Sequence, residues 1–156
     1  MPAEAMTYPD NTFDGIVFVD ILHHVDIAAT MAEVVRVLKP GAYVIGDELY
    51  THTGLQRIRE SQPVQRVLYP IMRRWIYGGT TPYITEDEHK IDEHEFALVT
   101  ARLTGMETDW FNIVEGRLYP TRLIWASRIE RAAMRPLSPL AAYLAGRVVF
   151  SGRLAK

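Results

Sequence analysis

The chain has 156 residues, of which 48% are apolar, 10% aromatic and 23% charged, and it contains no cysteine. A chain of this length buries roughly 70% of its unfolded surface, which suits a single domain over 1–156 and excludes disordered, collagen-like and disulfide-stapled proteins. The absence of cysteine also excludes thiol nucleophiles, zinc–thiolate centres and redox pairs.

Charge is divided unevenly along the chain. The segment from Arg117 to Lys156 holds eight Lys or Arg and one acid, whereas the first 116 residues hold nine bases and eighteen acids. This split indicates either a basic surface for an anionic partner or lipid headgroups, or two segments that neutralise each other when packed. The first ten residues do not resemble a signal peptide, and no apolar run approaches the roughly 20 residues of a membrane span. We therefore expect a cytoplasmic protein with at most peripheral membrane contact.

A strand, a helix and a second strand are predicted in succession over 13–48. The apolar run Phe13–Asp20 is bounded by turn-forming residues, as is typical of a strand buried on both faces. Asp26 is a candidate helix N-cap, apolar residues then recur at helical spacing, and Lys39-Pro40-Gly41 ends the helix. A second apolar run follows at 42–46. One βαβ crossover with two parallel neighbouring strands is therefore expected.

The rest of the chain alternates further helices and strands. Apolar residues over 54–77 have helical spacing that Pro63 and Pro70 interrupt, which predicts two or three short helices. Beyond them we expect a helix over 92–103 stopped by Gly105, a strand over 107–114, a basic amphipathic helix over 120–134 and a strand over 147–151. These elements predict an α/β layer protein. Its expected parts are a βαβ core over 1–48, a helical insert or lid over 49–104 and a strand–helix–strand over 105–156.

Acidic and imidazole side chains follow the two predicted parallel strands. Asp20, His23 and His24 follow the first strand, and Asp47 and Glu48 end the second. Ligands of open parallel sheets bind outside the carboxyl ends of the strands, where these groups would lie about 5 Å apart per strand step. The edge is a candidate active site. In the alternative, the acids cap turns and one histidine binds a backbone carbonyl.

Several other kinds of site are not expected. A metal site is disfavoured because His23 and His24 are sequence neighbours that diverge, and because His89 and His94 are five residues apart rather than four. Phosphate-binding loops of the GxGxxG and GxxxxGK[ST] kinds are absent from the sequence, as is the GxSxG nucleophile elbow. No nucleic-acid partner is expected, because no recognised motif or basic–aromatic stripe accompanies the C-terminal charge.

Two segments carry a pattern of known spacing. They are Tyr8-Pro-Asp-Asn-Thr-Phe-Asp-Gly-Ile-Val-Phe-Val-Asp-Ile-Leu-His-His-Val-Asp26 and Ala32-Glu-Val-Val-Arg-Val-Leu-Lys-Pro-Gly41. Together they resemble the middle of class I S-adenosylmethionine-dependent methyltransferases of the type 11 group, over residues 4–48. The resemblance implies a truncated Rossmann-like sheet of about four strands, with two parallel strands from the βαβ unit and then an antiparallel C-terminal pair, flanked by helices.

The resemblance also implies S-adenosylmethionine as the cofactor. The cofactor wall would consist of Ala5, Met6, Asp20, Ile21 and Leu22, and His23 or His24 would be the base. The glycine-rich loop and the acidic ribose ligand of the family lie N-terminal to the segment that matches here. We therefore expect this chain alone to bind the cofactor very weakly or not at all.

The methyl acceptor implied by the resemblance is a small molecule or a lipid. Its candidate contacts are Asp47 and the aromatic residues Tyr69, Trp75, Tyr77 and Tyr83, unless these aromatics belong to the core. The basic helix with Leu123, Ile124, Trp125, Ile129 and Met134 would lie on a membrane surface or, in the alternative, pack on the sheet.

Association with another chain is the last expectation. An unpaired, apolar edge over 13–19 is a pairing template, which predicts a homodimer or a partner that supplies the N-terminal half of the fold. The alternative to an enzyme is a non-catalytic, truncated methyltransferase-fold remnant that serves as a dimerising scaffold.

Overall fold

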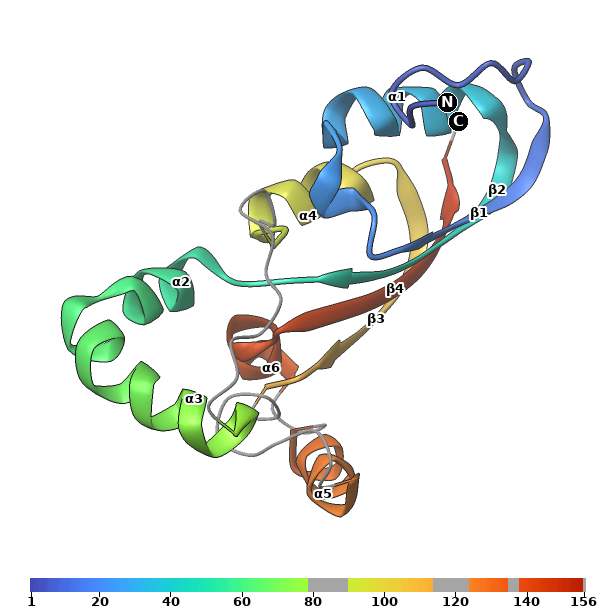
Figure 1. The fold of residues 1–156 in the computed structure, drawn as a ribbon. Coiled ribbons are helices and arrows are strands. Elements are labelled where there is room, and N and C mark those ends of the chain that lie inside the picture. The colour runs from blue at the N-terminus through green and yellow to red at the C-terminus, as the bar shows by residue number, and fades with distance from the viewer. Residues whose placement is uncertain (79–89, 114–123, 135–137, 156) are drawn as a thin grey trace. The chain divides into compact units, whose positions relative to one another are not determined.

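The computed structural model describes residues 1–78, 90–113, 124–134 and 138–155. It divides into two compact units (Figure 1). Unit 1 consists of residues 1–50, 87–109 and 147–156, and unit 2 of residues 51–86 and 110–146. Most of the sheet belongs to unit 1, whereas unit 2 is mainly helical.

Strands and helices alternate much as the sequence predicts. In chain order they are β1 (Phe13–Val19), η1 (Leu22–His24), α1 (Ile27–Val37), β2 (Leu38–Leu49), α2 (Thr53–Glu60), η2 (Val64–Leu68), α3 (Tyr69–Tyr77), α4 (Glu93–Thr100), β3 (Leu103–Phe111), α5 (Ile124–Met134), α6 (Ser138–Leu144) and β4 (Arg147–Leu154). The turn η1 is a 3₁₀ helix, and η2 is a single stretch of π-helix. In the part of the chain that the structure describes, every helix is too short or too polar to cross a bilayer.

The sheet has the strand order β1-β2-β4-β3. β1 pairs with β2 in parallel, and β2 pairs with β4 in antiparallel orientation. The amide of Ala155 donates to the carbonyl of Arg102, and the amide of Gly146 donates to that of Phe111, as expected for antiparallel β3 and β4. The predicted fold class is therefore confirmed: two parallel strands of a βαβ unit are followed by an antiparallel C-terminal pair.

α1 forms where its cap and apolar spacing predict it. The Asp26 carboxylate accepts a hydrogen bond from the Ala29 amide at 2.9 Å and so caps the first turn. Ile27, Met31 and Val34 lie on the buried side of the helix, which packs against β2 and α4. The helix ends at Val37, so the stop predicted at Lys39-Pro40-Gly41 was wrong: these residues already belong to β2, which begins at Leu38.

One face of the sheet in unit 1 forms the core. Its side chains alternate along the strands and include Phe18, Val44, Val148, Phe150 and Leu154, each less than 5% exposed. The ring of Phe150 contacts the ring of Phe96 edge-on, with centroids 5.4 Å apart. The backbone of Gly46 approaches the Phe150 ring so closely that any side chain at this position would overlap it. Glycine is therefore required at this point of β2.

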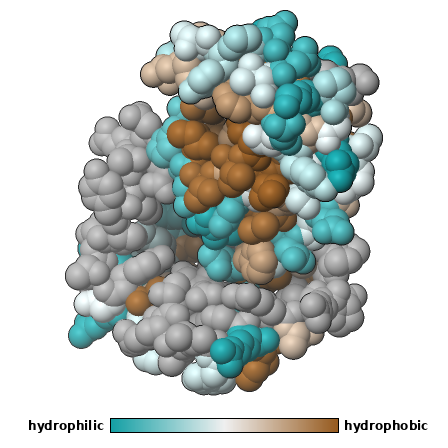
Figure 2. All heavy atoms as spheres, turned by 90° about the vertical axis from the view of Figure 1, so that its right-hand side faces the viewer, coloured by the Kyte–Doolittle hydropathy of each residue, from teal (hydrophilic) through white to brown (hydrophobic). Residues whose placement is uncertain are grey.

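The opposite face of β1 and β2 exposes apolar side chains. Val17 and Val19 are 64% and 60% exposed, and Tyr43 and Ile45 are 50% and 40% exposed. Figure 2 shows an apolar area, coloured brown, in the upper part of the view. In the described part of the chain, β1 pairs with β2 alone and leaves its other edge free. The predicted unpaired edge is thus present, but the expectation of a strand buried on both faces was wrong: Phe18 is the buried residue of β1, because the opposite face of the strand is not covered by any residue that the structure describes.

Some predicted boundaries were wrong. The helix expected over 92–103 ends at Thr100, and β3 already begins at Leu103 and runs through Gly105, whose φ is +61°. α6 was not predicted. The basic helix expected over 120–134 is described from Ile124 onward, and residues 120–123 lie outside the described residues.

Candidate functional site

The chain turns sharply where β1 ends. Asp20 has a φ of +49°, a left-handed conformation that aspartate tolerates better than most residues. Its amide donates to the Asp47 carbonyl at 3.0 Å, which fixes the end of β1 against the end of β2. The short helix η1 follows directly and carries both histidines.

The buried carboxylate of Glu48 anchors this turn. One oxygen, Oε1, accepts hydrogen bonds from the amides of Ile21 and Leu22, both at 2.9 Å. The other, Oε2, lies 3.1 Å from Nδ1 of His23. Glu48 is 0% exposed, so these three polar partners replace the water that its carboxylate loses on burial.

The two histidines occupy different environments. His23 is 3% exposed and is held through Nδ1 by Glu48, whereas His24 is exposed. Their ring centroids are 4.1 Å apart, so the rings are in contact. The buried histidine is therefore placed to position the exposed one, and His24 is the one that an incoming molecule can reach.

A second cluster joins the ends of three strand segments. One guanidinium nitrogen of Arg147 lies 2.8 Å from Oδ1 of Asp20 and 2.8 Å from Oδ1 of Asp47. Burial of the guanidinium works against its charge, but its hydrogen bonds to Asp47 and Asp20 outweigh burial and raise the pKa of Arg147. One arginine thus pairs with both carboxylates.

Asp20, His23 and Glu48 place potential metal-ligand atoms within 4.8 Å of one another. Each carboxylate already has protein partners: backbone amides and His23 for Glu48, and Arg147 for Asp20. A cation at this position would face the Arg147 guanidinium and would have to displace these donors. The donor set fits a hydrogen-bonded turn better than a metal centre.

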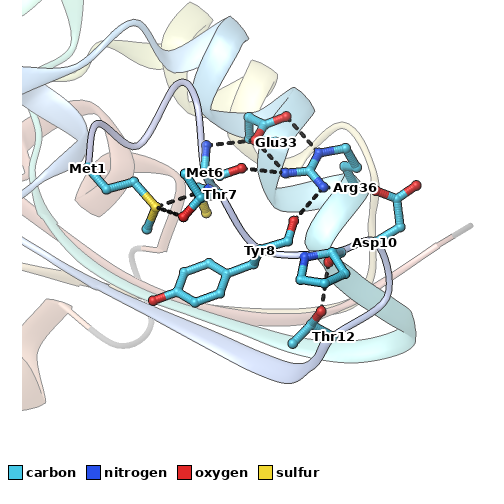
Figure 3. A network of polar contacts seen from close by, with 9 residues as sticks. Met1, Met6, Thr7, Tyr8, Asp10, Thr12, Glu33 and Arg36 are labelled. Atoms are coloured by element: carbon cyan, nitrogen blue, oxygen red, sulfur yellow. Dashed lines mark hydrogen bonds and ion pairs between the residues drawn. The ribbon is translucent and has the colours of Figure 1, made fainter.

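The N-terminal segment is clamped onto α1 by an arginine–glutamate pair (Figure 3). The guanidinium of Arg36 donates to the carbonyls of Met6 and Tyr8 and to the Asp10 carboxylate, at 2.7–2.8 Å. It also binds Glu33, whose Oε2 accepts a hydrogen bond from the Met6 amide at 2.8 Å. These bonds, first from Arg36 and then from Met6, lower the pKa of Glu33 to about 2.

The residues predicted to bind the cofactor or act as base lie at the strand ends and in the N-terminal segment. Asp20, Ile21, Leu22, His23, His24 and Asp47 come together at the carboxyl ends of β1 and β2. Leu22 is 0% exposed and belongs to the core, and Ile21 is 40% exposed. Ala5 is exposed and Met6 half-buried in the segment that Arg36 and Glu33 clamp.

The predicted acceptor residues on the helical segment lie in unit 2. Tyr69 and Trp75 belong to α3 and are 38% and 60% exposed. Tyr77 ends the same helix, but its side chain and the whole of Tyr83 lie outside the described residues. On α5, Trp125 and Ile129 are 64% and 60% exposed, whereas Leu123 and the side chains of Ile124 and Met134 lie outside the described residues.

Two residues of this region received no specific role from the sequence. Glu48 was expected at the edge together with Asp47, but alternation along β2 places it on the buried face with Val44 and Gly46, under the turn. This alternation could have been predicted from the sequence, because Glu48 lies two residues after Gly46 and four after Val44. Arg147 is 100 residues from Asp47 and 127 from Asp20, and no local pattern links them.

Known proteins resemble the chain in sequence and in fold. Residues 1–46 match the methyltransferase domain family. A geranyl diphosphate methyltransferase in complex with GPP and sinefungin superposes with a TM-score of 0.55 and 11% identity, over 97% of this chain and 50% of that one. A SAM-dependent methyltransferase from Methanosarcina mazei gives 0.52 and 20%, over 100% and 66%. The geranyl diphosphate C-methyltransferase from Streptomyces coelicolor A3(2) gives 0.51 and 12%, over 98% and 50%.

The four-stranded mixed sheet thus matches the fold of S-adenosylmethionine-dependent methyltransferases over the part of those structures that it covers. The resemblance predicted from the sequence is confirmed, because residues 1–46 match the methyltransferase domain family and the sheet has this fold. The chain spans 50% to 66% of the length of these three solved structures. No curated protein matches the chain in sequence.

Proposed function

We propose that this chain functions in cytoplasmic, S-adenosylmethionine-dependent methyl transfer to a small molecule or a lipid. The observation that carries the proposal is the turn at Asp20–His24. It lies at the carboxyl ends of two parallel strands, it begins with a left-handed residue, and the buried Glu48 fixes its backbone. Fixed turns at this edge are where open parallel sheets bind ligands.

The residues of the turn have separate roles in this proposal. Asp20 and Ile21, with Ala5, Met6 and the backbone of Leu22, form the cofactor side, and Asp47 contacts the acceptor. Methyl transfer breaks the carbon–sulfur bond of the sulfonium and forms a bond from the methyl carbon to the acceptor, so it depends on in-line placement of the two. A base is needed where the acceptor loses a proton. We assign that role to the exposed His24 and the positioning role to the buried His23.

Cofactor binding by the isolated chain is expected to be weak. Arg147 forms ion pairs with Asp20 and Asp47, and Glu48 accepts hydrogen bonds from two backbone amides and lies within hydrogen-bond distance of His23. A ribose hydroxyl that bound one of these carboxylates would have to compete with an existing ion pair or hydrogen bond. The backbone of the turn is therefore fixed, but the neighbouring carboxylates can bind the cofactor only by giving up their present partners.

A titration with S-adenosylhomocysteine followed by amide NMR tests the proposal. We expect fast-exchange shifts at residues 20–24 and at Met6, because weak binding still perturbs the amides that it touches. Asp20→Val disfavours the left-handed backbone on which the turn depends, and should weaken binding about tenfold. Asp14→Val, at the other end of β1, is the matched control. Shifts confined to other residues, or equal losses in both variants, would contradict the proposal.

A dimerising scaffold without catalysis is the second candidate function. Among the described residues β1 has one paired edge, and Val17 and Val19 are exposed; both observations favour the scaffold, because an unpaired apolar strand is a template for a further strand. Light scattering on the purified chain should then show a dimer. A monodisperse monomer would count against the scaffold and against a partner role for this edge.

A further inference from the structure

Unit 2 contains a helical arm formed by α2, η2 and α3 (Figure 1, green). The arm exposes apolar side chains to solvent. The exposed members are Ile58 at 54%, Val67 at 63%, Leu68 at 47%, Ile71 at 63% and Trp75 at 60%. Ile76, by contrast, is 7% exposed and faces the interior of the unit. The arm therefore has one packed face and one outward apolar face.

The outward side chains form a continuous stripe. Leu68 and Tyr69 both have right-handed helical backbone angles, so η2 runs into α3 and makes one helix from Val64 to Tyr77. Val67, Ile71 and Trp75 follow one another at four-residue spacing, which places them on the same side of that helix. This stripe is as wide as a single helix face.

Positive charge accompanies the stripe. Residues 53–77 hold five arginines and one acidic residue, Glu60. Arg66 and Arg74 are exposed on the same helix as the stripe. At the end of α3, Arg73 and Arg74 line a shallow hollow of about 470 Å³ together with Tyr69, Pro70 and Gly78. Tryptophan and aliphatic side chains on one face, with arginines beside them, are the composition of helices that lie in a membrane interface.

We propose that the outward face of the helical arm docks on an anionic lipid surface. Val67, Ile71 and Trp75 would enter the boundary between headgroups and acyl chains, and Arg66 and Arg74 would bind headgroup phosphates. A bilayer fits the face better than a protein partner does. The stripe exposes on the order of 400 Å², about half of what a stable protein interface buries on each side. The inference holds whether or not the chain transfers methyl groups, so the two proposals can fail separately.

Sedimentation with lipid vesicles tests the docking proposal. We expect the chain to bind vesicles of phosphatidylcholine with phosphatidylglycerol, to bind pure phosphatidylcholine far less, and to dissociate as salt is added. Ile71→Glu combined with Trp75→Glu should weaken binding at least tenfold, because two apolar anchors become charged. Arg66→Gln and Arg74→Gln should each weaken it about fivefold.

Leu98→Glu is the matched control for the added charge. Leu98 is 54% exposed on α4, a helix that begins with the acidic residues Asp92, Glu93 and Glu95, so its replacement should leave vesicle binding unchanged. Far-ultraviolet circular dichroism establishes that each variant is folded. Three results would overturn the proposal: no binding to the anionic vesicles, equal binding to both vesicle types, or equal losses with Leu98→Glu. A folded Ile71→Glu variant that binds vesicles normally but loses self-association would assign the stripe to a protein interface instead.

Discussion

Glu33 and Arg36 give a physical meaning to the Glu-x-x-Arg pattern in the sequence. Their three-residue spacing puts both side chains on the same side of α1, where they bind each other and hold the backbone of Met6 and Tyr8. The pair thus fixes the segment that we place on the cofactor side of the site. The Glu-x-x-Arg pattern, which forms part of the sequence resemblance, thus holds the N-terminal segment against α1.

Acidification should release this clamp. The folded-state pKa of Glu33 is about 2, below the ordinary value of 4.5, so its contribution to stability is present above pH 4.5 and is lost as pH falls toward 2. Glu33→Gln should flatten the pH dependence of unfolding in that window and speed hydrogen exchange at the Met6 amide. Urea unfolding at stepped pH measures the first effect, with Glu107→Gln on β3 as the control. Identical pH profiles for the two variants would contradict this role.

The chemistry-bearing side chains were predictable to different degrees. Asp20, His23, His24 and Asp47 could be found because they lie at or just after the end of an apolar run that predicts a strand, and strand ends mark the ligand edge of a parallel sheet. The pairing of Asp20 and Asp47 with Arg147 could not, since it depends on how β4 returns beside β2. Long-range charge pairing of this kind leaves no periodic signal in a single sequence.

The 3₁₀ turn η1 depends on a carboxylate from the neighbouring strand. Glu48→Ala would leave the amides of Ile21 and Leu22 and the His23 ring without their acceptor, and should cost about 3 kcal/mol of unfolding free energy. Glu48→Gln keeps an acceptor oxygen for the two amides and should recover part of the loss. Denaturant unfolding of both variants measures the difference. Equal stability of Glu48→Ala and the unchanged protein would show that the turn does not depend on this anchor.

The βαβ unit was the most predictable part of the fold. Its strand, N-cap and helix are all encoded locally, by apolar runs, Asp26 and helical spacing. The boundary between α4 and β3 was not, because Leu103–Phe111 becomes a strand through pairing with β4, and that pairing accommodates Gly105 at a positive φ. Pairing with β4 thus outweighed the local pattern that predicted a helix as far as Leu103.

The molecule combines a recognisable sheet with two apolar surfaces that the described residues do not cover. The apolar face of β1 and β2 lies in unit 1 and the outward stripe of the helical arm in unit 2. Composition alone suggested an ordinary complete domain, because it reports how much apolar surface exists and not where it lies. The fold adds that information, and the two surfaces lead to separate experiments: strand pairing for the first and lipid binding for the second.

We propose that the turn at Asp20–His24 contacts S-adenosylmethionine, and that this chain by itself binds the cofactor weakly or not at all. Isothermal calorimetry of the 156-residue chain with S-adenosylmethionine and S-adenosylhomocysteine tests it most directly. We predict a dissociation constant well above the micromolar range, because the carboxylates beside the turn are engaged by Arg147, His23 and backbone amides. A dissociation constant in the low micromolar range for either ligand would contradict the claim.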